Sequence, residues 1–256
     1  MKANYHSHTW RCNHAEGTER EMVERAIANG IQILGFSDHG PQIFPGEYYS
    51  NFRMRPEQLE DYVNQIFTLR EEYKDRIELH VGLEMEYYPN LFKNILPLLR
   101  NSGVEYMIIG QHFLGDEINE EQVIQPTDSK AELQRYCRQL TEGMNTGLFT
   151  YVAHPDVFHF VGDKTFYRQQ MRQICREANS CDLPLEVNLL GIRTKRNYPN
   201  EAFWQVAAEE NCKVVIGRDA HKPSHFDRLD ALEQGKELVK RYNLNLQETI
   251  QFHPIK

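Results

Sequence analysis

Seven short apolar segments run through this chain of 256 residues, and longer stretches with the periodicity of amphipathic helices separate them. Alternation of strands and helices favours a parallel sheet or a closed barrel over a sandwich of two sheets. We therefore expect an α/β fold of seven strand–helix units in a single domain, residues 1–256. The predicted strands cover residues 3–5, 31–36, 77–83, 104–109, 148–153, 183–189 and 213–216.

Local signals mark where helices begin. Thr18 with Glu21, and Ser129 with Glu132, have the spacing of a capping box, in which the two side chains satisfy free N–H groups of the first helical turn. The apolar faces of the helices should pack against the outside of the barrel. Residues 40–54 are aromatic and lack a helical pattern, so they predict a loop beside the strand ends.

Nine histidine and acidic residues follow the predicted strands in short clusters. Parallel barrels carry their active sites where the strands end, so these side chains should meet at one face. His6 and His8 are two residues apart, which places both on one side of an extended chain. Because first-row divalent metals favour imidazole and carboxylate ligands, the clusters predict a metal centre. The candidate ligands are His6, His8, His14, His39, Glu84, His112, His154, Asp219 and His221.

Other histidines and one cysteine have weaker positions. His80 lies within a strand, and His225 and His253 lie beyond the last cluster, so we interpret them as core or surface residues. His159 follows a candidate ligand by five residues and could reach a substrate. Cys12 lies between two candidate ligands, but a small buried thiol is the simpler interpretation.

Charge and cysteine content narrow the partners and the compartment. A formal net charge of −8 without a cluster of Lys and Arg disfavours nucleic acid, although bound cations would reverse the local field for an anionic substrate. Five cysteines without a C-x-x-C pair indicate a reducing compartment, so we expect a cytoplasmic protein. With no apolar run of transmembrane length, we expect no membrane partner. A small molecule is the expected partner, and the oligomeric state is not predicted.

The motifs around these residues resemble those of the PHP phosphoesterases, the family named for polymerase and histidinol phosphatase. The resemblance spans nearly the whole chain and rests on HSHT, CNHAEG, GFSDH, VGLEMEY, IIGQHF, AHPD and GRDAH. Residues 53–84 are also similar to the histidinol-phosphate phosphatase branch in particular. The resemblance implies a distorted seven-stranded TIM-like barrel that holds three divalent ions (Zn, Fe or Mn) at the C-terminal face of its strands.

The resemblance also implies a distribution of the ligands among the ions. Glu84 would bridge two ions, and a water between two close ions is acidic enough to supply a hydroxide nucleophile near neutral pH. Glu84 and Asp219 are therefore expected to take part in catalysis. One ion would be held by His6, His8, Glu84 and Asp219, a second by Glu84, His112 and His154, and the third by His14, His39 and His221.

Three residues are candidates for binding the substrate. Arg193 follows the sixth predicted strand, and its guanidinium could make paired hydrogen bonds to phosphate, which would also give it a catalytic role. Arg218 and His159 could contact the substrate as well. Gln111 and Arg218 depart from the common family pattern, in which Ser-Val and a small serine are frequent. Near the site, Glu47, Glu86 and Asp156 would favour a cationic substrate.

These expectations describe a metal-dependent phosphomonoesterase, and the branch resemblance implies hydrolysis of L-histidinol phosphate to L-histidinol and phosphate in histidine biosynthesis. Other phosphomonoesters remain open as substrates, because ligand spacing describes the reaction and not the alcohol; they include nucleotides, sugar phosphates and phosphotyrosine. An amidohydrolase fits less well, because that family typically uses a carboxylated lysine as the bridge. A metal-binding domain without catalytic activity is the remaining alternative.

Overall fold

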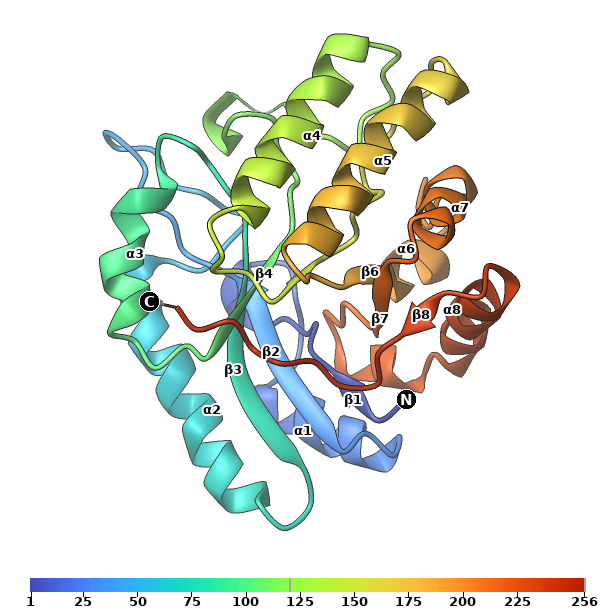
Figure 1. Ribbon diagram of the computed structural model, residues 1–256. Helices are drawn as coiled ribbons and strands as arrows, with labels where there is room; N and C mark the ends of the chain where they lie inside the picture. The colour runs from blue at the N-terminus through green and yellow to red at the C-terminus, as the bar shows by residue number, and fades with distance from the viewer. Residues whose placement is uncertain (120, 256) are drawn as a thin grey trace.

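The structure is a computed structural model that describes residues 1–119 and 121–255. Within these residues, eight parallel strands form one sheet in sequential order, so every strand lies beside its neighbours in the chain (Figure 1). The strands are β1 (Ala3–Asn4), β2 (Ile33–His39), β3 (Glu78–Met85), β4 (Tyr106–Ile109), β5 (Tyr151–Val152), β6 (Leu185–Asn188), β7 (Lys213–Gly217) and β8 (Asn245–Leu246).

The sheet curls back on itself where its strands end. Ser7 forms a parallel bridge with Ala220, the backbone N–H of His8 donates to the carbonyl of Ala220 (2.8 Å), and the N–H of Ala220 donates to His6 (3.2 Å). The chain after β1 therefore pairs with the chain after β7. The parallel α/β architecture was predicted, whereas the additional strand β8 was not, because Asn245 and Leu246 are both exposed and make no apolar run.

Helices surround the sheet on its outer side (Figure 1). The capping box predicted for Thr18 and Glu21 is present, and the Ser129 side chain accepts from the N–H of Glu132; such caps stabilise a helix by about 1 kcal/mol. The α-helices are α1 (Glu19–Ala28), α2 (Leu59–Tyr73), α3 (Phe92–Arg100), α4 (Lys130–Met144), α5 (Lys164–Ser180), α6 (Leu189–Thr194), α7 (Glu201–Glu209) and α8 (Leu229–Arg241). The 3₁₀ helices are η1 (Trp10–Cys12), η2 (Pro56–Gln58), η3 (Glu117–Asn119) and η4 (Pro223–Asp227).

Tyr106 fills the interior of the barrel below the strand ends. Its hydroxyl donates to the carbonyls of Tyr5 (2.9 Å) and Phe36 (3.2 Å), and its ring occupies the space that a side chain at Gly82 would need. The chain after β8 covers this end of the barrel, with Phe252 stacked on Tyr106 at 4.5 Å between ring centroids. The interior is thus a packed core, and the active sites of such barrels lie at the opposite end, where the strands terminate.

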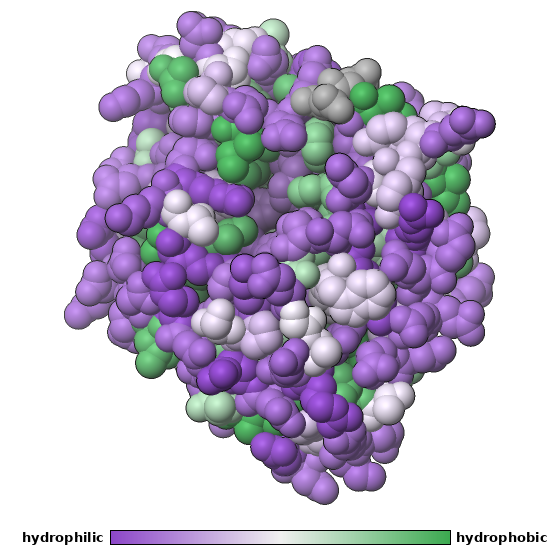
Figure 2. Space-filling view, turned by 180° about the vertical axis from the view of Figure 1, so that it is seen from behind, coloured by the Kyte–Doolittle hydropathy of each residue, from purple (hydrophilic) through white to green (hydrophobic). Residues whose placement is uncertain are grey.

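The opposite end carries the strand termini and their loops. Figure 1 is seen from the side of the C-terminal tail, so Figure 2 views the other face, which is largely hydrophilic and hollowed near its middle. Residues 40–54 form a loop without helix or strand, as predicted. His39 and Glu84 lie inside β2 and β3, because both strands run further than expected. Among the helices of residues 1–119 and 121–255, none has the length and apolar character needed to span a membrane.

Candidate metal centre

The nine predicted ligands come together at the C-terminal ends of the strands. His6 and His8 follow β1, His14 follows η1, and the other six come from β2, β3 and the segments after β4, β5 and β7. Five triads of potential ligand residues lie there, each with its ligand atoms within 4.8 Å of one another. Eight of the nine residues belong to these triads; His112 does not, although its Nε2 lies 3.7 Å from Glu84 Oε1.

Glu84 occupies the middle of the cluster, and its two oxygens face different histidines. Oε2 lies 3.1 Å from His39 Nδ1 and 3.5 Å from His6 Nε2, whereas Oε1 lies 2.8 Å from His154 Nε2. Burial alone would raise the pKa of Glu84, but His39, His112 and His6 hold this pKa well below its usual range. An ionised carboxylate with two separate sets of imidazoles has the geometry of a bridge between two cations.

Asp219 faces the same cluster from the end of β7. Its Oδ1 lies 3.2 Å from His8 Nε2 and 3.1 Å from His221 Nδ1. The backbone of Asp219 has a φ of 49°, in the left-handed region that side chains other than glycine rarely adopt. Such a conformation persists only where neighbouring groups hold it, and it often occurs at functional sites.

Several buried polar atoms of this cluster have no hydrogen-bond partner in the described part of the chain. They include His6 Nε2, both ring nitrogens of His8, His39 Nδ1 and Asp219 Oδ1. Leaving one such atom unsatisfied costs about 1–3 kcal/mol. His8 Nδ1 faces Asp38, whereas the other four atoms face one another or Glu84. Divalent cations would satisfy several of them at once, so the residues fit a metal centre of imidazole and carboxylate ligands.

Electrostatics around His6 also favour positive charge. Burial lowers the pKa of His6, but Glu186, Asp219 and Glu84 raise it to about 10. Three carboxylates around one imidazole create a strongly negative field, which protons or metal ions must neutralise.

His14, His39 and His221 form a triad that adjoins Glu84 and Asp219. The Nε2 atoms of His14 and His221 are 3.1 Å apart, and Phe52 packs on His14 (5.2 Å between centroids) and His39 (4.4 Å). Burial and His8 lower the pKa of His221 to about 4. The ring is therefore neutral near pH 7, which is the form that binds metals.

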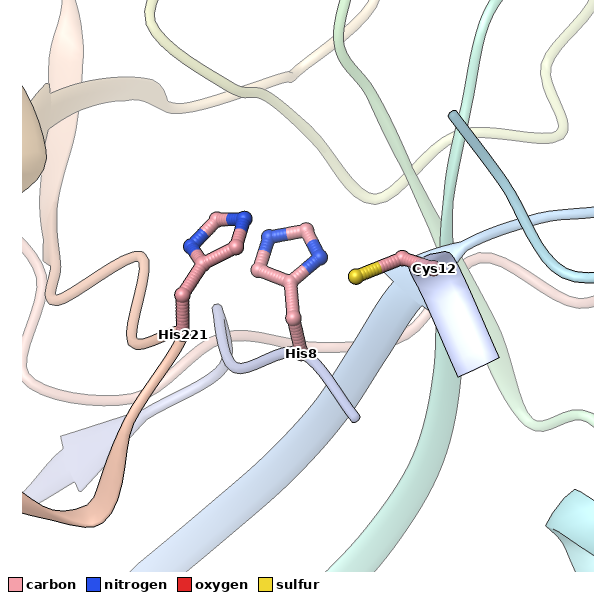
Figure 3. A group of neighbouring side chains, drawn as sticks. All are labelled: His8, Cys12 and His221. Carbon is pink, nitrogen blue, oxygen red and sulfur yellow. The ribbon is translucent and has the colours of Figure 1, made fainter. Parts of the chain in front are cut away.

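Cys12 lies beside this group. Figure 3 shows His8 between His221 and Cys12, with the sulfur directed toward the His8 ring. The thiol is fully buried, its Sγ lies 3.1 Å from the carbonyl of Thr9, and burial raises its pKa to about 11. These features agree with the predicted small buried thiol.

An open cavity of about 270 Å³ lies over the cluster. A second hollow of about 190 Å³ shares three lining residues with it, Phe52, His112 and Arg196, and is otherwise mostly apolar, with Phe113, Val123, Ile124 and Val157. The first cavity is lined by His14, His39, Phe52, Glu84, His112, Leu190, Arg196, Tyr198, Asp219 and His221.

The predicted substrate-binding residues have other partners. Arg193 donates from Nη1 to the carbonyl of Arg218 and from Nη2 to that of Asp219, both at 2.5 Å, and lies 3.0 Å from His225 Nδ1. Arg218 is buried, with its Nη1 3.3 Å from the carbonyl of His225. His159 Nδ1 lies 3.3 Å from the carbonyl of Ile124. None of the three side chains is among the described residues that line the two hollows.

The acidic residues expected to attract a cationic substrate are also engaged elsewhere. Glu86 is buried against Arg53 (3.0 Å) and His112 Nδ1 (3.2 Å). Asp156 is buried and accepts from Trp204 Nε1 at 2.9 Å. Glu47 is exposed on the loop and lines neither hollow as described.

Sequence reasoning missed three residues that contact the cluster or its cavity, and it placed Glu86 near the site without its contact to His112. Glu186 lies 2.7 Å from His6 Nδ1. Asn188 donates to Asp219 Oδ2 at 3.0 Å. Arg196 lines both hollows and donates to the hydroxyl of Tyr198 at 3.1 Å. The available signal for Glu186 and Asn188 was their spacing, since two polar residues two apart in an apolar strand share one face.

Residues 4–189 match the family described as PHP domain. The chain belongs to the PHP family. The family resemblance of the motifs is thereby confirmed, and a match covering most of the chain extends from β1 into α6.

Two curated relatives and one solved structure are similar to this chain over most of its length. The chain is 30% identical to "Probable histidinol-phosphatase" of Deinococcus radiodurans, over 92% of this chain and 93% of the relative. It is 40% identical to "Probable phosphatase" of Acetivibrio thermocellus, over 91% and 88%. The crystal structure of histidinol phosphate phosphatase from Lactococcus lactis, complexed with Zn, L-histidinol and phosphate, has a TM-score of 0.75 at 21% identity, over 98% of this chain and 97% of that chain. That likeness shows a shared fold.

Proposed function

We propose that this protein is a metal-dependent phosphomonoesterase that hydrolyses L-histidinol phosphate to L-histidinol and inorganic phosphate. The observation that carries the proposal is the central position of Glu84, whose two oxygens face separate sets of imidazoles. The substrate is supported by the name of the Deinococcus relative and by the L-histidinol and phosphate in the Lactococcus structure.

Three divalent ions, Zn, Fe or Mn, would occupy the centre. His6, His8, Glu84 and Asp219 would hold the first ion, and Glu84, His112 and His154 the second. His14, His39 and His221 would hold the third, and the closeness of their ligand atoms supports this assignment. Zinc in the Lactococcus structure supports a metal of this kind.

When bound, such ions lower the pKa of water and neutralise phosphoryl oxygens, which is the chemistry that hydrolysis of a phosphate ester requires. The protein's own part is to place and enclose the ester. Phe52 packs over three candidate ligands and limits access of water from the loop side. Within the described residues Arg196 is the one lysine or arginine that lines the cavity, so we assign it the phosphate contact first given to Arg193.

The alcohol part of the substrate would lie in the second hollow. Its apolar side chains suit a flat ring, and its described lining holds no carboxylate to pair with an ammonium group. A phosphomonoester with an uncharged alcohol would fit the same space.

A phosphate-release assay over L-histidinol phosphate, sugar phosphates, nucleotides and phosphotyrosine tests the proposal, with metal-loaded protein throughout. We expect the highest kcat/KM for L-histidinol phosphate. A wide preference for another ester would reject the histidinol assignment and retain the phosphatase. Absence of phosphate release from every ester, by protein with a full metal content, would reject phosphatase activity itself.

A further inference from the structure

β6 provides none of the nine candidate ligands, yet two of its side chains contact three of them. Glu186 and Asn188 are two residues apart, so both point to the inner side of the sheet. Both are buried, with exposed fractions of 0% and 1%. A buried carboxylate in a barrel core is costly unless its oxygens are fully used, so its contacts indicate its role.

The first contact fixes the ring of His6. Glu186 Oε1 lies 2.7 Å from His6 Nδ1, on the far side of the ring from Nε2, which faces Glu84 and Asp219. An ionised carboxylate only accepts hydrogen bonds, so Nδ1 must carry the proton. In the neutral ring, Nε2 then presents its lone pair to the cluster, which is the tautomer a metal ligand requires.

The second contact holds the backbone of His154. Glu186 Oε2 accepts from the N–H of His154 at 3.0 Å. His154 has a φ of 29°, so its backbone has left the regions that a histidine ordinarily adopts. The hydrogen bond to Glu186 helps to keep this conformation, which directs Nε2 of the ring at Glu84 (2.8 Å).

Asn188 links the same carboxylate to Asp219. Its Nδ2 donates to Glu186 Oε2 (2.9 Å) and to Asp219 Oδ2 (3.0 Å), while its Oδ1 accepts from the N–H groups of Leu190 and Gly191 at the start of α6. Because the oxygen is used by the helix, the amide cannot turn over without losing these bonds. Asp219 is thereby left with Oδ1 directed at His8.

The neighbouring strand leaves room for this arrangement. Gly217 of β7 is paired with Asn188, and a Cβ at position 217 would overlap Glu186 Oε1. A glycine at this point is therefore required for the Glu186 carboxylate to reach His6.

We propose that Glu186 is a positioning residue that fixes the tautomer of His6 and the backbone of His154 for metal binding. This inference rests on the metal centre of the proposed function. The Glu186 carboxylate thus orients His6 and His154 from outside the set of candidate ligands. Asn188 supports a third candidate ligand, Asp219, in the same way. Outer groups of this kind change metal affinity by about 10–100-fold when removed.

The substitution Glu186→Gln tests the proposal because glutamine keeps the size but has only one oxygen. Its NH₂ group would face either His6 Nδ1 or the N–H donors of His154 and Asn188, and beside His6 it would favour the tautomer with the proton on Nε2. We expect zinc affinity, measured by competition with a chromophoric chelator, to fall by about 10–100-fold. We also expect the ¹⁵N signals of the His6 ring, recorded with zinc-loaded protein, to shift or disappear.

Glu105→Gln is the matched control. Glu105 also accepts from a backbone N–H, that of Val81 (2.8 Å), but it precedes β4 at the other end of the barrel. Its substitution should leave zinc affinity and the His6 signals unchanged. If Glu186→Gln does not fold, the ¹⁵N spectrum of the zinc-loaded wild type tests the proposal by itself. We expect it to show the proton on Nδ1 of His6 and the metal on Nε2.

The outcomes separate this inference from the proposed function. Normal zinc binding by the wild type, together with unchanged affinity and unchanged His6 signals in Glu186→Gln, would overturn the role of Glu186 and leave the metal centre intact. A wild-type His6 that binds zinc through Nδ1 would overturn it as well. A wild type that binds no zinc would contradict the metal centre and the inference together.

Discussion

His39 and Glu84 lie directly opposite each other on neighbouring parallel strands, with His39 Nδ1 3.1 Å from Glu84 Oε2. This distance is set by the register of β2 and β3, which pair over seven residues. If one of the two strands slipped by one residue, its ligand side chain would turn away from the cluster. The centre of the proposed site is therefore built on rigid strands, which hold ligands more closely than loops do.

Glu84→Gln should impair turnover because it removes the only negative charge that faces both sets of imidazoles described here. Charge stabilisation by bound ions contributes several kcal/mol, so we expect kcat to fall by about 100-fold or more. The assay is phosphate release together with elemental analysis of metal per chain. Glu105→Gln serves again as the control. Turnover close to that of the wild type with a full metal content would exclude a bridging role for Glu84.

Arg196→Ala should weaken the contact with the phosphate and leave the metals in place. A charge-assisted hydrogen bond contributes about 1.5–3 kcal/mol, so kcat/KM should fall by roughly 10–200-fold. Lys195→Ala, the control, removes the same charge from an exposed neighbour that lines neither hollow as described. Equal kinetics of the two variants would mean that Arg196 does not hold the phosphate.

Arg193→Ala should act on the protein in a different way. Arg193 donates to the carbonyls of Arg218 and Asp219. These carbonyls lie on either side of the Asp219 Cα, where the backbone has a φ of 49°. The loss of Arg193 should lower the free energy of unfolding by about 1–3 kcal/mol, because buried carbonyls lose their donors. Urea unfolding measures the free energy of unfolding, and elemental analysis measures the metal content per chain. A large rise in KM at unchanged stability would instead restore the phosphate contact predicted from the sequence.

His80 provides a prediction of pH dependence away from the site. Burial alone would lower the pKa of His80, but the carboxylates of Glu105 and Glu78 raise it above its ordinary value of 6.5. Its stabilising contribution is therefore complete below pH 6.5 and is lost as the pH rises through the raised value.

Unfolding free energies at about pH 6 and about pH 9 measure this contribution. The difference between wild type and His80→Gln should be larger at the lower pH. His253→Gln is the control, because His253 makes no ion pair within the described residues. A difference that is constant with pH, or that grows as the pH rises, would contradict the prediction.

Most of the fold could be predicted because strand and helix leave different periodicities in the sequence. The seven apolar segments all lie at observed strands, and the Thr18 capping box marks the start of α1. β8 could not be predicted, since two exposed residues paired with β7 leave no apolar pattern. The prediction ended both β2 and β3 before their observed last residues, because it interpreted the polar residues His39 and Glu84 as part of loops.

The candidate ligands could be selected from the sequence because each follows a predicted strand, and such ends meet in a parallel barrel. The arginine that faces the cavity could not be selected from the sequence in this way. Arg193 and Arg196 belong to one basic stretch, and the turn at Lys195, with a φ of 55°, determines which of them reaches the opening. The spacing of Glu186 and Asn188 indicates that both share one face of a strand, but it does not identify the residues that they contact.

Anomalous X-ray diffraction at the zinc edge from zinc-loaded crystals is the most direct test of the metal centre. We predict three peaks at the C-terminal ends of the strands, each about 2.0–2.2 Å from its ligand atoms. One peak should lie beside each oxygen of Glu84, and the third should lie among His14, His39 and His221. Fewer than two peaks in active protein, or peaks away from Glu84, would contradict the proposed multinuclear site.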